Sequence, residues 1–354
     1  MEFADTAEQA ALRGTVRAFA GRHGGREQLR ATMARPDGYD PKVWQRLTGE
    51  LGLTALAVPE RHGGAGAGPR EVAVVVEELG RVLLPSPYLS SAVAALTLAR
   101  AAEHGDGAAA AERYLPGLAD GSVIGALALD ADVTVTAGTV TGTAQHVVDG
   151  AAAGLLLVRC DDRLLAVAAA DATVEPLDTL DQTRRQAAAR FDRALALAAG
   201  SAAAALALHR VLLAAECSAA AEHCLEVTVD YLKTRRQFGR PIGSFQALQH
   251  RAADLAVAVI AARATAQAAV WTAAADPAAL AALAPLAALH CSRTFRQTAA
   301  EMIQLHGGIG FTWEHEAHLY FKRATATRLL LGPVGALRAE IGREAGLLPG
   351  PSGS

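Results

Sequence analysis

One short stretch of the sequence gathers the residues best suited to binding an anion. The segment YLKTRRQFGRPIGSFQ places Lys233, Arg235, Arg236, Phe238 and Arg240 within eight residues. Guanidinium groups grip phosphate oxygens through paired hydrogen bonds, and a nearby aromatic ring can stack on a base, so a nucleotide with a pyrophosphate would suit this segment. Cations that simply stabilise the C-terminus of a helix are the alternative, and the segment taken alone favours that simpler interpretation.

A second candidate segment lies near the end of the chain. In IQLHGGIGFTWEHEAHLYFKRA, Gln304 falls on the last turn of an expected helix, just before Gly307 and Gly308. Clustered glycines let a backbone approach a ligand closely and expose amide donors to it, although an ordinary helix end has the same appearance. His315 and His318 are three residues apart, whereas a zinc-binding helix has its histidines four apart. We therefore expect no metal site, and we interpret both histidines as surface residues.

The pattern of apolar and polar residues changes along the chain. Residues 1–120 carry apolar side chains at helical spacing. Residues 121–194 form short β-branched or alternating segments broken by Gly and Asp, which is typical of a small antiparallel sheet. Long alanine-rich runs in 195–345 indicate an antiparallel four-helix bundle, and 346–354 is predicted to be a flexible tail. We expect a mainly α protein with a small β-domain.

Two features of the expected helices are specific. Thr6 and Gln9 have the spacing of a capping box, so they predict the start of the first helix. The alanine-rich runs predict long helices over 196–234, 244–275 and 278–305.

Composition excludes several classes of function. Of 354 residues, 51% are hydrophobic and 19% are charged, and the net charge is −3, so no extended field would attract nucleic acid or an anionic membrane. No signal peptide is evident, and no segment is expected to reach membrane-spanning length without charge. The four cysteines are scattered at Cys160, Cys217, Cys224 and Cys291, which fits buried free thiols in a reducing cytoplasm.

Taken together, the two candidate segments resemble the signature sequences of the acyl-CoA dehydrogenase family. The first is TRRQFGRPIGSFQALQH and the second is QLHGGIGFTWEHEAHLYFKRA. The segments FADTAEQAAL, WQRLTGELGLTALAVPERHGGAG and EELGR resemble the N-terminal domain of that family, so the resemblance covers nearly the whole chain. It implies an N-terminal helical domain, a small antiparallel β-domain and a C-terminal four-helix bundle. It also implies FAD-dependent α,β-dehydrogenation of an acyl-CoA thioester, with FAD bound between subunits.

The resemblance also assigns contacts to the cofactor. It implies that Arg235 contacts the FAD pyrophosphate and Phe238 the adenine. The other implied contacts along the adenosine half are Gln237, Gln304, Gly307 and Gly308. In this family such residues reach across a subunit interface to the flavin seated in the neighbouring chain, so an oligomer is expected.

The sequence departs from the family at the catalytic base. The reaction needs a carboxylate that takes a proton from the carbon alpha to the thioester. In most members this glutamate directly precedes a glycine, some twenty residues after the GGxGF segment, but here Leu331 precedes Gly332. Other members carry the base on the first bundle helix, just before an arginine, and that position is His209 here. His209 is a weak candidate base, and Glu216, two turns further along the same helix, has similarly weak support.

A second departure concerns the seat of the flavin ring. The family usually has a Thr-Glu-Pro-x-Ala-Gly-Ser-Asp turn that holds the ring, and this chain has ALALDADVTVTAG. A later aromatic-x-Thr/Ser-Asn segment appears here as HVVDG. The adenine-binding arm is thus kept while the ring seat and the base are lost. The chain therefore resembles the degenerate subunit of two-subunit actinobacterial acyl-CoA dehydrogenases, including those of steroid side-chain breakdown.

These departures lead to one hypothesis and two alternatives. The hypothesis is a hetero-oligomer in which a catalytic acyl-CoA dehydrogenase subunit supplies the base, the ring seat and most of the acyl pocket. One alternative is a self-sufficient homo-oligomeric enzyme that uses a non-standard base such as His209. The other is a non-enzymatic scaffold subunit, in which the arginine segment has no cofactor to bind.

Overall fold

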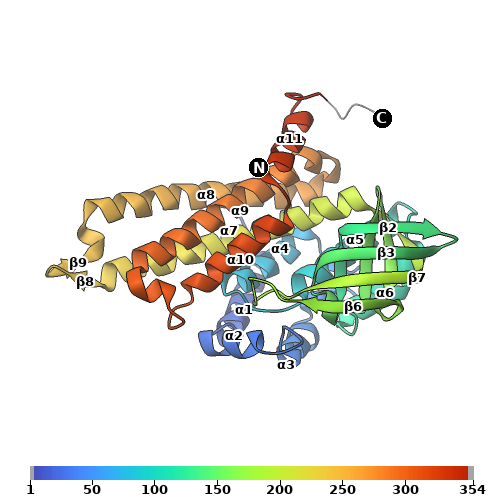
Figure 1. Ribbon diagram of the computed structural model, residues 1–354, viewed down its shortest axis with the longest axis horizontal. Helices are drawn as coiled ribbons and strands as arrows, with labels where there is room; N and C mark the ends of the chain where they lie inside the picture. The colour runs from blue at the N-terminus through green and yellow to red at the C-terminus, as the bar shows by residue number, and fades with distance from the viewer. Residues whose placement is uncertain (1–3, 350–354) are drawn as a thin grey trace. The chain divides into compact units, whose positions relative to one another are not determined.

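The computed structural model describes residues 4–349 (Figure 1). The chain forms two compact units. One contains the residues up to Arg26, Val76–Leu84 and the residues from Leu213 on, and the other contains Glu27–Val75 and Pro85–Leu212. The three-domain division at residues 120, 194 and 345 stays a prediction. Of the expected tail, residues 350–354 lie outside the described residues.

The first 120 residues are helical, as expected. The helices are α1 (Ala7–His23), α2 (Arg26–Met33), α3 (Pro41–Gln45), α4 (Pro69–Arg81), α5 (Tyr88–Glu103) and α6 (Ala108–Asp120). The capping box at the start of α1 is confirmed: the Thr6 hydroxyl accepts from the Gln9 N–H, and the Gln9 side chain accepts from the Thr6 N–H. Both bonds satisfy amide groups that the helix itself leaves without partners.

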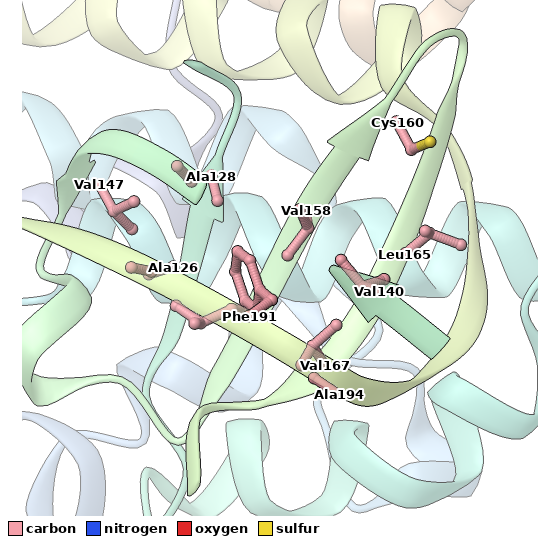
Figure 2. Packing of buried hydrophobic residues seen from close by; sticks show 13 residues of the cluster. Ala126, Ala128, Val140, Val147, Val158, Cys160, Leu165, Val167, Phe191 and Ala194 are labelled. Atoms are coloured by element: carbon pink, nitrogen blue, oxygen red, sulfur yellow. The ribbon is translucent and has the colours of Figure 1, made fainter. Parts of the chain in front are cut away.

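The β-domain is a seven-stranded sheet. Its strands are β1 (Gly125–Ala128), β2 (Asp130–Thr136), β3 (Thr139–Val148), β4 (Leu155–Cys160), β5 (Arg163–Ala168), β6 (Ala172–Leu177) and β7 (Gln186–Ser201). The order is β1-β4-β5-β7-β3-β2, with β6 paired to β7. All pairs are antiparallel except β1 with β4. Figure 2 shows Phe191 of β7 among buried apolar side chains that include Val140, Val158 and Val167.

The boundary between the sheet and the bundle differs from the prediction. The alanine-rich run was expected to become helical at 195–196, but β7 continues to Ser201 and the helix begins at Ala202. Residues Ala196, Leu197 and Ala198 pair with β5 instead. Alanine favours helix intrinsically by only a few tenths of a kcal/mol per residue, about the size that sheet pairing readily overrides.

The remaining helices form the expected bundle. They are α7 (Ala202–Thr234), α8 (Gln246–Ala275), α9 (Leu280–His306) and α10 (Ala317–Leu330), followed by the shorter α11 (Val334–Glu344). In Figure 1 the first four lie alongside one another, and α9 packs against α8, α10 and α11. The three long helices expected from the alanine-rich runs are confirmed, with α7 starting later than predicted.

Three of these helical segments are long and apolar enough to cross a membrane by length and composition: Ala202–Thr234, Gln246–Ala275 and Pro277–Phe311. All three segments include charged side chains, for example Arg210, Arg263 and Arg293, so they do not contradict the expectation that no segment reaches that length without charge. Within the fold, 67% of the apolar window of the first segment is buried, but only 33% of that in Gln246–Ala275. Helix α8 therefore has the largest share of its apolar window uncovered.

Candidate cofactor site

The arginine segment forms a tight hairpin between α7 and α8. Strand β8 (Arg236–Gln237) pairs with β9 (Arg240–Pro241), and Figure 1 places the hairpin at one end of the two helices. The two turn residues both have positive φ, 53° at Phe238 and 77° at Gly239. This is the pattern of a two-residue type I′ turn, whose first position favours Asn or Asp. A phenylalanine there is strained, and such strain is found where structure serves a site.

The side chains of the hairpin differ in what they contact. Arg236 donates to the Gly239 carbonyl at 3.0 Å, and the Arg240 guanidinium lies 4.0 Å from the centre of the Phe245 ring. Arg235 is exposed, and among residues 4–349 its guanidinium has no hydrogen bond or ion pair. Phe238 is 92% exposed, with only an edge-on contact to Phe245 at 6.1 Å between ring centres. The whole of residues 233–240 is exposed, and Arg235 and Phe238 contact less of the hairpin than Arg236 and Arg240 do.

The glycine segment is equally accessible. Helix α9 ends at His306, and a 3-10 turn follows over Gly307–Phe311. Gln304, Gly307 and Gly308 are exposed, and a Cβ placed on either glycine would meet no atom within 4 Å. Gly310 is different, because a Cβ there would lie 2.8 Å from the Ile303 carbonyl oxygen. Gly310 is therefore required by packing, whereas Gly307 and Gly308 leave space for a ligand to approach the backbone.

A ring contact brings the two segments together. Tyr231, one turn before Arg235, stacks on His306 with 4.3 Å between ring centres, and its hydroxyl donates to the His306 carbonyl at 3.4 Å. The sequence interpretation missed Tyr231 and His306. The only available signal was their position, because one flanks each motif.

The candidate base positions hold no free carboxylate. Leu331 follows α10 and is buried, so an apolar side chain fills the position where most of the family has glutamate. His209 is half-buried on α7. Glu216 is buried and forms an ion pair with Arg323 at 2.6 Å. The side chain of Glu216 also packs over Gly80, where a Cβ would lie 2.3 Å from it. Glu216 is thus held in a buried ion pair, which weakens it as a candidate base.

The chain is short at the position where the family has its ring-binding turn. Strands β1 and β2 are joined by a single residue, Leu129, so the chain has no extended loop at this point. The HVVDG segment ends β3 with Val147 fully buried, and Ser90 donates to the Asp149 carboxylate at 2.6 Å. Asp149 adopts a φ of 58° and is therefore committed to a local turn.

No metal centre is evident. Within the described part of the chain, no group of three or more His, Cys, Asp and Glu side chains is placed to hold a metal ion. His315 and His318, expected at the surface, are both half-buried. The rings of His315 and His306 lie 4.4 Å apart, and His318 packs edge-on against Trp313 at 4.5 Å. Both histidines therefore have packing roles.

Comparison with known proteins matches both helical parts of the chain. The profile of the acyl-CoA dehydrogenase N-terminal domain matches residues 6–122, and that of the C-terminal domain matches residues 199–346. The chain belongs to the acyl-CoA dehydrogenase family. The resemblance of the two motifs and the predicted fold class are thereby confirmed.

Individual members of the acyl-CoA dehydrogenase family are similar over nearly the full length. Acyl-CoA dehydrogenase IpdE2 of Mycobacterium tuberculosis is 43% identical over 324 residues, which is 92% of this chain and 93% of IpdE2. The ChsE4-ChsE5 complex from Mycobacterium tuberculosis has a similar structure, with a TM-score of 0.89 and 28% identity over 99% of this chain and 100% of that chain. A Tcur3481-Tcur3483 steroid ACAD variant gives a TM-score of 0.88 and 30% identity, over 96% and 98% of the two chains.

Acyl-CoA dehydrogenases use FAD, so the predicted cofactor is confirmed at the level of the family. The residues of this chain fit one half of that molecule. A pyrophosphate and an adenosine would suit the exposed Arg235 guanidinium, which has no partner in the described part of the chain, the exposed Phe238 ring in its strained turn, and the two open glycines. The one-residue link between β1 and β2 does not offer a comparable seat for the flavin ring. The individual contacts stay a prediction.

Proposed function

We propose that this chain is the non-catalytic subunit of a hetero-oligomeric, FAD-dependent acyl-CoA dehydrogenase. The observation that carries this proposal is the pairing of an accessible arginine hairpin with a buried leucine, Leu331, at the usual base position. Leucine cannot accept a proton, and Glu216 is held by Arg323. A catalytic partner with an intact glutamate would therefore remove the proton alpha to the thioester. FAD, when bound, accepts the hydride from the beta carbon.

The proposed contribution of this chain is to hold the adenosine half of the cofactor. Arg235 would pair with the pyrophosphate, and Phe238 would stack on the adenine. Gln237 and Gln304 would supply amide hydrogen bonds beside them. The open backbone at Gly307 and Gly308 would lie along the adenosine. What supports this division is the exposure of these side chains, together with the turn strain that the hairpin tolerates.

A partner surface is also part of the proposal. Helix α8 follows the hairpin directly and exposes Val257 by 70% and Ile260 by 68%. Large apolar side chains on an exposed helix face are typical of a surface that another chain covers. The name of the ChsE4-ChsE5 complex, which pairs two chains, supports a partner of the same family.

We further propose a steroid-derived acyl-CoA as the substrate class and the cytoplasm as the location. The substrate class is supported by the similarity to a structure described as a steroid ACAD. The location is supported by four cysteines that are all buried and free of disulfides, which fits a reducing compartment.

The test measures flavin absorbance per chain. The protein is purified alone and also after co-expression with an acyl-CoA dehydrogenase encoded beside it. We expect flavin only in the co-purified complex, at about one FAD per pair of different chains. Full flavin occupancy in the chain alone would refute the proposal and favour a self-sufficient enzyme, with His209 as the first candidate base.

A matched pair of variants tests the hairpin. Arg235→Ala should remove most of the flavin from the complex, because it removes the guanidinium assigned to the pyrophosphate. Lys233→Ala makes the same charge change two residues away and should leave flavin content unchanged, since Lys233 has only a long ion pair with Asp230 at 3.6 Å. Equal flavin in both variants would favour a scaffold role.

A further inference from the structure

Three aromatic side chains form a continuous stack beside the candidate cofactor site. Tyr231 of α7 lies against His306 of α9, with 4.3 Å between ring centres and 27° between planes. His315, which follows the glycine segment, lies on His306 at 4.4 Å and 46°. His306 is therefore the central ring, and it is 4% exposed. These three residues are called the ring stack below.

The ring stack is joined to both candidate segments through the backbone. The Tyr231 carbonyl accepts from the Arg235 N–H at 2.8 Å, and the Arg235 carbonyl accepts from the Ile242 N–H at 2.8 Å, which closes the base of the hairpin. On the other side, His306 immediately precedes Gly307. A Cβ on Gly310 would lie 3.1 Å from the His306 Cβ. A shift of the central ring would therefore move the hairpin and the glycine segment relative to each other.

Both imidazoles have hydrogen bonds that fix the ring orientation. The Nδ1 of His306 lies 2.7 Å from the Met302 carbonyl oxygen, so this nitrogen carries the proton and donates. The Nδ1 of His315 accepts from the Ala317 N–H at 3.1 Å. Burial lowers the pKa of both groups, that of His315 to about 4, with His306 and Arg26 adding to the effect there. Neutral rings stack without the repulsion that two imidazolium groups would have.

We propose that His306 is a positioning residue for the cofactor, which sets the distance between the arginine hairpin and the glycine segment. This inference rests on the proposed function, in which one FAD contacts both segments. Two groups that grip the same ligand must be held to within about 0.5 Å to act together. The side chains that would touch the ligand are exposed, so their spacing has to come from a buried contact behind them. The ring stack is that contact.

The experiment compares three variants of the full chain by hydrogen–deuterium exchange. His306→Leu keeps apolar bulk but removes the ring, and His306→Phe restores a ring without the Nδ1–H donor. His223→Leu is the matched control, because His223 is another histidine packed against a tyrosine, Tyr320, with 5.4 Å between ring centres, but it lies on α7 and not on α9. We expect the amides of residues 235–240, 242 and 307–311 to exchange about 3- to 10-fold faster in His306→Leu. Exchange should return to within about 2-fold in His306→Phe and stay at wild-type values in these segments for His223→Leu.

A second readout is the rate at which FAD leaves the co-purified complex, which should rise by about 3- to 10-fold in His306→Leu. Wild-type exchange of the hairpin in His306→Leu would overturn the inference, and so would faster exchange with unchanged FAD release. A wild-type complex that contains no flavin would overturn the proposed function, whatever the exchange rates are. If His306→Leu does not fold, Tyr231→Leu removes the ring that packs against His306 from α7, and we expect the same changes in exchange and FAD release. Tyr231→Phe is its ring-preserving control.

Discussion

Replacing Phe238 by asparagine should stabilise the hairpin and weaken cofactor binding at the same time. Phe238 has a φ of 53°, in the left-handed region that suits Asn and Gly, and it is followed by Gly239 at 77°. The ring is 92% exposed, so little buried surface is lost when it is removed. Phe238 is unfavourable for the turn and contributes little packing, so binding of a ligand is the most direct explanation for a phenylalanine at this position.

The magnitude follows from these contributions. The left-handed conformation costs an ordinary residue about 1–2 kcal/mol, most of which asparagine avoids. Loss of the edge-on contact with Phe245, at 6.1 Å between ring centres, offsets about 0.5 kcal/mol of that gain. The hairpin should therefore close more favourably by about 0.5–1 kcal/mol, which slows local exchange by roughly 2- to 5-fold. Loss of ring stacking on a base costs about 1–3 kcal/mol, so FAD affinity should fall by at least about 5-fold.

Two assays measure the two effects. Exchange of the Ile242 amide, which is bonded to the Arg235 carbonyl, reports closure of the hairpin in the isolated chain. Titration of the apo complex with FAD reports affinity. Phe238→Trp is the control, since it keeps an aromatic ring and the turn strain, and it should leave both quantities close to wild type. Unchanged or tighter FAD binding by Phe238→Asn would show that the strained ring has no part in holding the cofactor.

Three further predictions concern the buried ion pair, pH and the partner surface. Arg323→Met should lower the free energy of unfolding by about 3–5 kcal/mol in urea titration, because it leaves Glu216 buried and charged, and the double variant with Glu216→Leu should recover most of the loss. Burial lowers the pKa of His223 to about 4, so its neutral form stabilises the fold above pH 6.5. That stabilisation, about 3 kcal/mol, should be lost as pH falls from 6.5 to 4, and His223→Gln should flatten that part of the stability profile. Val257→Glu with Ile260→Glu should prevent association in light scattering without changing the melting temperature of the isolated chain, and an intact complex would contradict the surface assigned to α8.

Much of the fold could be predicted because it depends on local signals. The Thr6–Gln9 capping box is a contact three residues apart, and the long bundle helices follow from continuous alanine-rich runs. The end of β7 could not be predicted in this way. Residues 196–198 are helix formers by propensity, and their pairing with β5, some thirty residues earlier in the chain, holds them in the sheet.

The candidate site shows the same division. Arg235 and Phe238 could be identified because the family motif is a run of adjacent residues. The contact between Tyr231 and His306 joins residues 75 positions apart, and no spacing rule relates them. Glu216 was a candidate base because of its position on the helix face, and nothing in the sequence indicated that it is paired. Its partner, Arg323, lies 107 residues away. The charge state and role of a buried carboxylate depend on such distant partners.

This chain keeps the residues predicted to bind the adenosine half of FAD and lacks the usual catalytic base, and this division has a physical basis. Proton abstraction and hydride transfer require the base, the thioester and the flavin ring to be held together with near-attack geometry, so they cannot be divided freely between chains. The adenosine end of FAD takes no part in the chemistry and can be held by a neighbouring subunit without disturbing that geometry. Substitutions in the hairpin and the ring stack of this chain should therefore change how tightly FAD is held. They should leave kcat of the fully loaded complex close to wild type, whereas a change to the partner's base would lower kcat and leave FAD affinity unaffected.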